Sequence, residues 1–351
     1  KKISQKIIFL LFLTFFLVGL FTFKDYGISV DEEWHRISGF YFLNYILSFT
    51  SFDELKNIVD IKLNEFDIFY FGTAFEVVAN NPYHGVVFDL PLALIEVVFK
   101  IDDSKEYFHL RHLLTFLLFF VSSIFFYKLL LNRFLNYNIA LIGTLFFVLS
   151  PRIYGHSFFN NKDVVFLSLA AIALYYCFKS LEKLSYKNLF IFAILAALAT
   201  GQRILGIFFP ISFIFFYLLT VLSNNKNLKS SPYIIFFIVF YCLFLILFWP
   251  VLWSNPIEKF FLAFQYFSHH FLHIQSLFDG NYVYSSFLPY DYIFTWILIS
   301  SPILYLILFV IGYILIFKRF FIRFINIKSN THYYDLWRGN NEKKDFFILF
   351  N

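Results

Sequence analysis

The chain has 351 residues, of which 60% are hydrophobic and 25% aromatic, and its mean hydropathy is +0.70. This composition is typical of a polytopic membrane protein and excludes a soluble fold. The net charge of +5 does not indicate nucleic-acid binding, because the basic residues are distributed by membrane side and not along one face. Both cysteines, Cys177 and Cys242, lie in apolar runs, which predicts buried thiols and no disulfide framework.

The first apolar run, 7–23, follows three lysines and precedes no small-residue cleavage site. It is therefore interpreted as an uncleaved transmembrane helix in preference to a signal peptide. Residues 24–111 contain no run of about 20 apolar residues. They predict one large first outer loop whose amphipathic pieces, 37–49 and 86–100, lie at the membrane interface.

Further apolar runs recur after this loop, and several are short for a bilayer span, so their flanking residues must snorkel or the helices must be partly re-entrant. The runs are 113–131, 139–149, 164–178, 189–200, 204–222, 233–252 and 292–317. Together they predict one all-α membrane domain over 1–351. The chain lacks Met and ends in the apolar segment 346–350, which indicates a piece of a longer protein with a truncated C-terminus.

Charge distribution predicts the orientation. With Lys1 cytoplasmic, alternation places 24–111, 152–163, 201–203 and 253–291 outside and 128–138, 179–187, 223–232 and 318–345 inside. Most of the 28 Lys and Arg residues then fall inside, as the positive-inside rule requires. Only four of the 23 acidic residues do so, Glu182, Asp335, Glu342 and Asp345, and this asymmetry favours a functional outer face. The basic stretch 318–345 predicts a cytoplasmic connector that contacts anionic lipid headgroups.

The segment 27–36, GISVDEEWHR, places three consecutive carboxylates just after the first apolar run. Asp31, Glu32 and Glu33 would stand at the mouth of a transmembrane helix, where a carboxylate suits a general base or a metal ligand. The simpler interpretation is an acidic helix-to-loop junction in which Glu32 pairs with Arg36 at i,i+4 spacing.

Four later segments carry isolated charges and aromatic residues at predicted helix ends: SPRIYGHSFFNNKDV (150–164), ATGQRILG (199–206), WPVLWSNP (249–256) and LPYDYIFTW (288–296). With Asp31-Glu32 and the acidic first loop, their order resembles the GT-C glycosyltransferases that use polyprenyl-phosphate sugars. Within that class the chain resembles the protein O-mannosyltransferase and lipid A aminoarabinose transferase group, a bacterial family 39-like type. The resemblance implies a GT-C transmembrane helix bundle with a large first extracytoplasmic loop.

The same resemblance implies roles for the charged residues. Asp31 would be the catalytic base that removes the acceptor hydroxyl proton, and Glu32 would position the acceptor or a cation. Asp163 would be a second carboxylate near the donor. Arg203 would bind the lipid phosphate of the donor bidentately, and Arg152 and Lys162 are second candidates for the same phosphate.

Each role has a structural alternative. Asp163 is equally suited to be the N-cap of the following helix, and His156 and Asn160 share its face at spacings of seven and three. Arg203 between two apolar runs is otherwise a snorkelling loop arginine.

His269, His270 and His273 have the spacing of metal ligands, but an aromatic, His-rich interfacial loop explains them without metal. The metal therefore stays unknown, with a divalent cation as the open alternative and no certain cofactor. Three aromatic residues are interpreted as interfacial belt residues: Trp249, Trp253 and Tyr290.

The sequence thus predicts an inverting membrane glycosyltransferase that moves a sugar from a polyprenyl-phosphate donor to a glycolipid, glycan or protein. We expect a multi-pass protein of the bacterial inner membrane whose active site faces the periplasm. The alternative is a sugar or lipid transporter or flippase, in which the same charges line a translocation path. A membrane subunit with a degenerate site is the third interpretation. No nucleotide-binding loop is present in the sequence.

Overall fold

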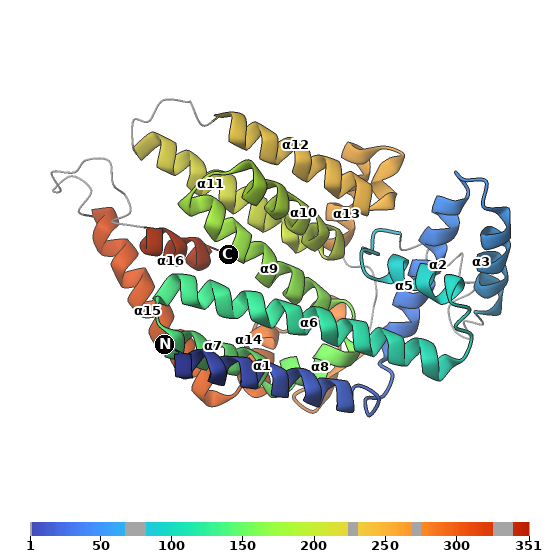
Figure 1. Cartoon of the computed structure of the whole chain (residues 1–351), viewed down its shortest axis with the longest axis horizontal. Helices are drawn as coiled ribbons and strands as arrows, with labels where there is room; N and C mark the ends of the chain where they lie inside the picture. The colour runs from blue at the N-terminus through green and yellow to red at the C-terminus, as the bar shows by residue number, and fades with distance from the viewer. Residues whose placement is uncertain (1, 67–81, 224–230, 269–274, 326–339, 351) are drawn as a thin grey trace.

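The computed structural model describes residues 2–66, 82–223, 231–268, 275–325 and 340–350, and this part of the chain is almost entirely helical (Figure 1). The helices are α1 (Lys2–Thr22), α2 (Val30–Leu47), α3 (Asp53–Glu65), α5 (Asp89–Val98), α6 (Ser104–Phe134), α7 (Tyr137–Val148), α8 (Pro151–Phe159), α9 (Asp163–Glu182), α10 (Tyr186–Gln202), α11 (Phe208–Ser223), α12 (Ser231–Phe248), α13 (Pro256–Ser268), α14 (Tyr292–Ser300), α15 (Ile303–Ile325) and α16 (Asn340–Phe350). Short 3-10 turns, η1 (Ile204–Ile207) and η3 (Pro250–Trp253), extend two of the apolar runs.

Among the described residues, four helices are long and apolar enough to cross a membrane by length and composition. These are Gln5–Thr22, Ser104–Phe134, Asp163–Glu182 and Ile303–Ile322. The pair α7 and α8, bent by 61°, adds a fifth if it forms one span, and the apolar segments Ile204–Leu218 and Pro232–Phe248 are shorter. The fold class is therefore an all-α polytopic membrane protein, as the composition predicts.

Helices α2, α3 and α5 gather at one end of the elongated bundle, where α6 reaches them (Figure 1). The 31 residues of α6 extend for about 46 Å, whereas the hydrocarbon core of a bilayer is about 30 Å thick. Helix α6 is therefore longer than an apolar layer is thick, and Arg111 and His112 near its N-terminus pair with α5 and α2. Helix α2 approaches α5 closely at Gly39, where an added Cβ would lie 2.4 Å from the Asp89 carbonyl oxygen.

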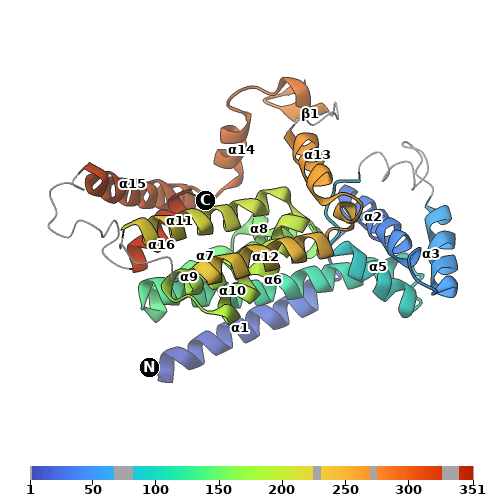
Figure 2. The ribbon, with the colours of Figure 1, turned by 90° about the horizontal axis from the view of Figure 1, so that it is seen from above.

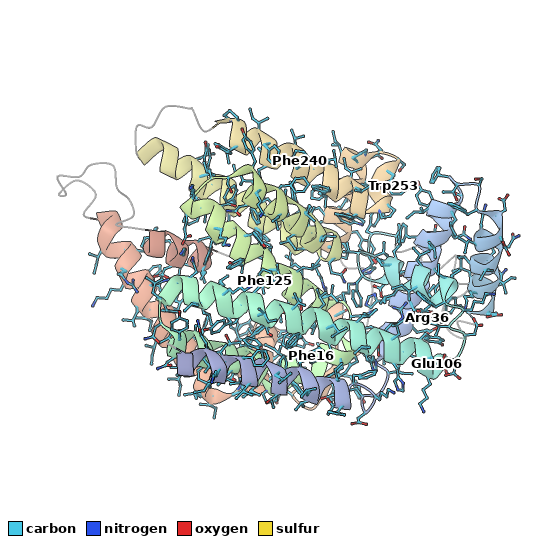
Figure 3. All side chains as sticks on the ribbon, in the orientation of Figure 1. Phe16, Arg36, Glu106, Phe125, Phe240 and Trp253 are labelled. Carbon is cyan, nitrogen blue, oxygen red and sulfur yellow. The ribbon has the colours of Figure 1, made fainter. Side chains whose placement is uncertain are left out.

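Side chains fill the space between the helices along the whole bundle, and many of them are aromatic (Figure 3). One core cluster joins α9, α10, α11 and α12, with Phe192 and Phe237 stacked at 4.9 Å between ring centroids. A second cluster joins α2, α3 and α5, and Phe40 is fully buried in it. The first outer loop thus has a small hydrophobic core of its own.

The opposite end of the bundle carries a second group of charges. Arg133 at the end of α6 pairs with Asp345 of α16, and Lys344 pairs with Glu182 at the end of α9. These contacts join three segments that the predicted topology places on the same side of the membrane. The basic stretch 318–345 was expected to contact lipid headgroups. Lys344 in this stretch does not, because it is only 1% exposed.

Four sequence-based predictions are corrected by the structure. The run 292–317 is two helices, because Pro302 follows the end of α14 and starts a new helix. The first loop ends at Asp103, whose carboxylate caps α6 by accepting from the backbone N–H groups of Lys105 and Glu106. Trp249 is a core residue and not a belt residue, since it is 1% exposed. Cys177 is buried, but Cys242 is exposed on α12.

The predicted outer loop 253–291 contains α13 and a two-stranded antiparallel hairpin that stands beside the bundle with α14 (Figure 2). Strand β1 (Gln275–Phe278) pairs with β2 (Asn281–Tyr284). The turn residues Asp279 and Gly280 have φ values of 48° and 77°, as a two-residue turn between twisted strands needs. Tyr290, next to this hairpin, is 96% exposed, which fits the predicted belt position.

Candidate active site

The N-terminus of α2 holds two adjacent carboxylates in different environments. Glu32 is fully buried, and its carboxylate accepts hydrogen bonds from the backbone N–H of Ser29 at 2.6 Å and contacts His112 Nε2 at 2.9 Å. The first of these contacts is a capping interaction that fixes the start of α2. Asp31, one residue earlier, is exposed. Of the two, only Asp31 is open to a substrate.

The predicted pairing of Glu32 with Arg36 is wrong. Arg36 donates through Nε to Glu96 at 2.9 Å and approaches Glu33 at 3.4 Å. Its guanidinium also lies over the ring of Tyr107, 3.6 Å from the centroid. Glu32 and Arg36 share a face of α2, but each pairs with a buried group of another helix, Glu32 with His112 of α6 and Arg36 with Glu96 of α5.

The turn between α8 and α9 gathers the side chains that the sequence placed on one face. Asn160 Oδ1 accepts from the backbone N–H of Asp163 at 2.8 Å, and Asn160 Nδ2 lies 3.0 Å from His156 Nδ1. Asn160 Nδ2 also donates to Asp163 Oδ2 at 3.3 Å. Asp163 is the first helical residue of α9 and Lys162 is at the N-cap position, so the prediction of Asp163 as the N-cap is wrong.

Arg203 follows the last residue of α10 and forms an ion pair with Asp163. The two side chains are 37% and 59% exposed, so the pair is open to solvent. Exposed ion pairs stabilise a fold by about 0–1 kcal/mol. An incoming anion can therefore displace Asp163 from Arg203 at low cost.

Lys162 meets a residue that sequence reasoning missed, His84. Lys162 Nζ lies 2.6 Å from His84 Nδ1. Next to His84, Gly85 lets the backbone approach α10 closely, because an added Cβ there would lie 1.6 Å from the carbonyl oxygen of Gly201. The loop before α5 thus packs directly on the end of α10, beside Arg203.

The electrostatics show that these charges act on one another. Burial and, after it, the Arg203 charge lower the pKa of Lys162, and Asp89, Asp163 and Asp31 oppose the shift, so that the pKa lies at about 8. Three carboxylates from separate segments therefore act on one amine.

A neutral histidine and a buried carboxylate border the same cluster. Burial lowers the pKa of His35 well below its usual value, and Lys162, His84, Arg203 and Arg111 add to this. His35 stands one helical turn after Asp31 on α2. Burial raises the pKa of Asp89 to about 6, opposed mainly by the Arg111 guanidinium. The sequence signalled neither residue.

The remaining predicted site residues are less closely placed. Arg152 is exposed in the first turn of α8, one turn before His156. His269, His270 and His273 lie outside the described residues. In the described ranges, no group of three or more His, Cys, Asp and Glu side chains is arranged to hold a metal ion.

The helical spans and the charge cluster at their ends define a polytopic membrane protein with a polar site at one face. Residues 90–253 match the family model described as dolichyl-phosphate-mannose-protein mannosyltransferase. This match supports the resemblance to the GT-C glycosyltransferases over that part of the chain. No curated protein and no solved structure matches the chain. The matched range contains Lys162, Asp163 and Arg203 and begins after Asp31.

Proposed function

We propose that the protein transfers a sugar from a polyprenyl-phosphate donor to an acceptor hydroxyl at the extracytoplasmic face. The observation that carries this proposal is the ion pair of Arg203 with Asp163 next to Lys162, on whose pKa the charges of Arg203, Asp163 and Asp31 all act. Two cations beside each other suit a leaving phosphate, and an exposed carboxylate suits the removal of a hydroxyl proton. The acceptor is a glycolipid, a glycan or a protein.

The reaction is a single displacement. Asp31 accepts the proton of the acceptor hydroxyl while its oxygen bonds to the anomeric carbon. The bond from that carbon to the phosphate oxygen breaks, and the lipid phosphate leaves with the electron pair. Attack from the face opposite the phosphate inverts the anomeric configuration. Lys162 and Arg203 stabilise the negative charge on the leaving phosphate.

Asp163 holds Arg203 before the donor arrives and releases it to the phosphate. Asp163 is then free to bind a hydroxyl of the transferred sugar or a cation. Glu32, which is buried on His112, fixes the start of α2 and so orients Asp31. We place the active site on the periplasmic face of a bacterial inner membrane, because most basic residues lie in the loops predicted on the opposite, cytoplasmic side.

Replacing Arg203 with alanine is expected to lower kcat/KM for the lipid donor by about 10- to 150-fold. The basis is the loss of a hydrogen bond to a charged group, about 1.5–3 kcal/mol. Initial rates over a range of donor concentrations measure the change. Lys183→Ala, which removes an exposed positive charge at the opposite end of α9, is the matched control and keeps the wild-type value. Equal rates for both variants would exclude Arg203 from the phosphate site.

The pKa of Lys162 predicts an alkaline limit. Lys162 is positively charged below about pH 8 and loses its charge above it. Because kcat/KM reports the free enzyme, its value for the donor should fall as the pH rises through 8. Lys162→Arg keeps the charge and should move this fall to above pH 10. A fall near pH 8 in the arginine variant would assign the titration to another group.

A further inference from the structure

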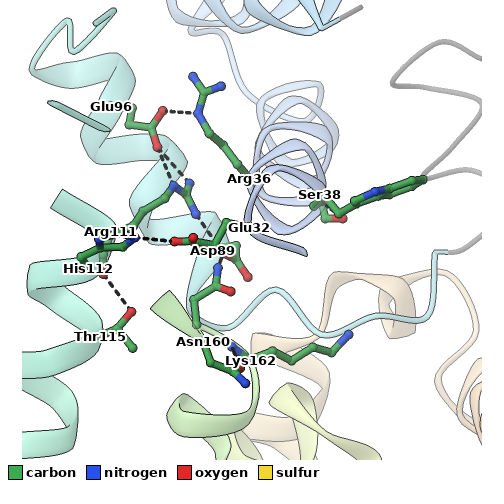
Figure 4. A network of polar contacts seen from close by, with 12 residues as sticks. Glu32, Arg36, Ser38, Asp89, Glu96, Arg111, His112, Thr115, Asn160 and Lys162 are labelled. Carbon is green, nitrogen blue, oxygen red and sulfur yellow. Dashed lines mark hydrogen bonds and ion pairs between the residues drawn. The ribbon is translucent and has the colours of Figure 1, made fainter. Parts of the chain in front are cut away.

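A buried network of charged groups links the segments that supply the candidate site (Figure 4). Arg111 of α6 is fully buried and donates to Asp89 Oδ1 at 3.0 Å through Nη1. It also donates to Glu96 Oε1 through Nε at 3.1 Å and Nη2 at 2.9 Å. The other oxygen of Glu96 accepts from Arg36 Nε. Two guanidinium groups and two carboxylates thus balance each other in the interior, as buried charges require.

The network continues to the residues that precede the two cations. Asp89 Oδ1 accepts a second hydrogen bond from Asn161 Nδ2 at 2.7 Å. The carbonyl oxygen of Asn161 in turn accepts from Gln202 Nε2 at 3.3 Å. Asn161 directly precedes Lys162, and Gln202 directly precedes Arg203. Both Asn161 and Gln202 are nearly fully buried, at 2% and 1% exposure.

The other branch of the network reaches the helix that carries Asp31. Arg36 and Glu32 hold α2 on Glu96 and His112, respectively. His112 directly follows Arg111 on α6, so the same turn of α6 holds the start of α2 directly and the Asn161 turn through Asp89 of α5. Because each link is buried and hydrogen-bonded, the positions of the two attachments are coupled.

We propose that Asp89 and Asn161 are positioning residues that set the location of Lys162 and Arg203 relative to Asp31. Neither residue touches the substrate. The inference rests on the proposed function for its catalytic consequence, although the coupling of the segments is independent of it. A displacement of about 1 Å between reacting groups costs on the order of 100-fold in rate.

The test removes the link at Asn161, because Asn161→Ala leaves the ion pair of Asp89 with Arg111 in place. Spin labels at Ile28→Cys and Leu205→Cys, both exposed and close in sequence to Asp31 and Arg203, report the distance between the two segments. The full chain with Cys177 and Cys242 replaced by alanine carries the labels. Ser122→Ala is the control, since this buried hydroxyl of α6 donates to the carbonyl oxygen of Phe119 in its own helix.

We expect Asn161→Ala to broaden the distance distribution and to lower kcat by about 30- to 100-fold, with donor KM changed by less than about threefold. Ser122→Ala should change neither. An unchanged distribution in Asn161→Ala overturns the proposal whatever the activity, and so does a broadened distribution with wild-type kcat. If Asn161→Ala broadens the distance distribution but the parent protein transfers no sugar, the proposed function is overturned and only the coupling of the segments is supported.

Discussion

Replacing Asp31 with asparagine is expected to lower the turnover number for sugar transfer by about 10²- to 10⁴-fold. This range is the usual contribution of a general base to a rate, and asparagine keeps the size of the side chain while losing the proton acceptor. Donor binding should stay close to the wild-type value, because the phosphate is bound by Lys162 and Arg203. Labelled sugar incorporated per minute at saturating donor measures the effect.

The control for this substitution is Asp25→Asn, which removes an exposed carboxylate six residues earlier in the same loop. It should retain the wild-type turnover. If Asp31→Asn transfers sugar as fast as Asp25→Asn does, the base is another residue, and Asp163, which pairs with Arg203, is then the next candidate.

Replacing Arg111 with methionine is expected to destabilise the protein by about 3–5 kcal/mol. The side chain is fully buried, and its loss leaves Asp89 and Glu96 without the cation that they share. Removing one partner of a buried ion pair is costly because the remaining charge stays desolvated. A denaturant titration of the purified protein in detergent measures the free energy of unfolding.

Arg319→Met is the matched control for Arg111→Met. Arg319 is 48% exposed and lies 3.4 Å from Asp345 at the other end of the bundle, so its loss should change the free energy of unfolding by only about 0–1 kcal/mol. Equal stability of the two variants would mean that the interior tolerates the loss of the guanidinium shared by Asp89 and Glu96, and the buried network would then not stabilise the fold as we describe.

Much of the fold could be predicted from the sequence, because a bilayer span requires a long apolar run and such runs are visible in the sequence. The ends of the helices were less predictable. Pro302 divides the last long run, and hydropathy alone does not register that break. Trp249 stands at the end of an apolar run, as a belt residue would, yet it is buried against Phe260 of α13. The sequence pattern does not show that α13 packs there.

Contacts among the candidate site residues were predictable where these residues are close in sequence. Asn160, Lys162 and Asp163 share one motif, and their mutual contacts follow from helical spacing. The contact of Lys162 with His84 was not predictable in this way, because the two are 78 positions apart and meet only when Gly85 packs on Gly201. A signal for the role of Glu32 was present, since Ser29 and Glu32 have the spacing of a capping box.

Partners in the buried network were the least predictable part. Asp89, Glu96 and Arg111 lie in stretches that read as an interfacial helix and a loop end, and only the tertiary structure encloses them. Buried carboxylates with partners and exposed carboxylates contribute equally to the acidic composition of the first loop. The composition therefore does not indicate which carboxylates are exposed. The exposed Asp31 and the buried Glu32 are adjacent in sequence and differ only through this packing.

The most direct test of the account is the fate of labelled mannose in proteoliposomes that contain the full-length protein and polyprenyl-phosphate mannose. A panel of glycolipid, glycan and peptide acceptors is supplied on the side that carries Asp31. The account predicts label in a covalent acceptor product of inverted configuration, and much less with Asp31→Asn. Label that crosses the bilayer while still on the lipid phosphate, with no product for any acceptor, would contradict it and favour the transporter alternative.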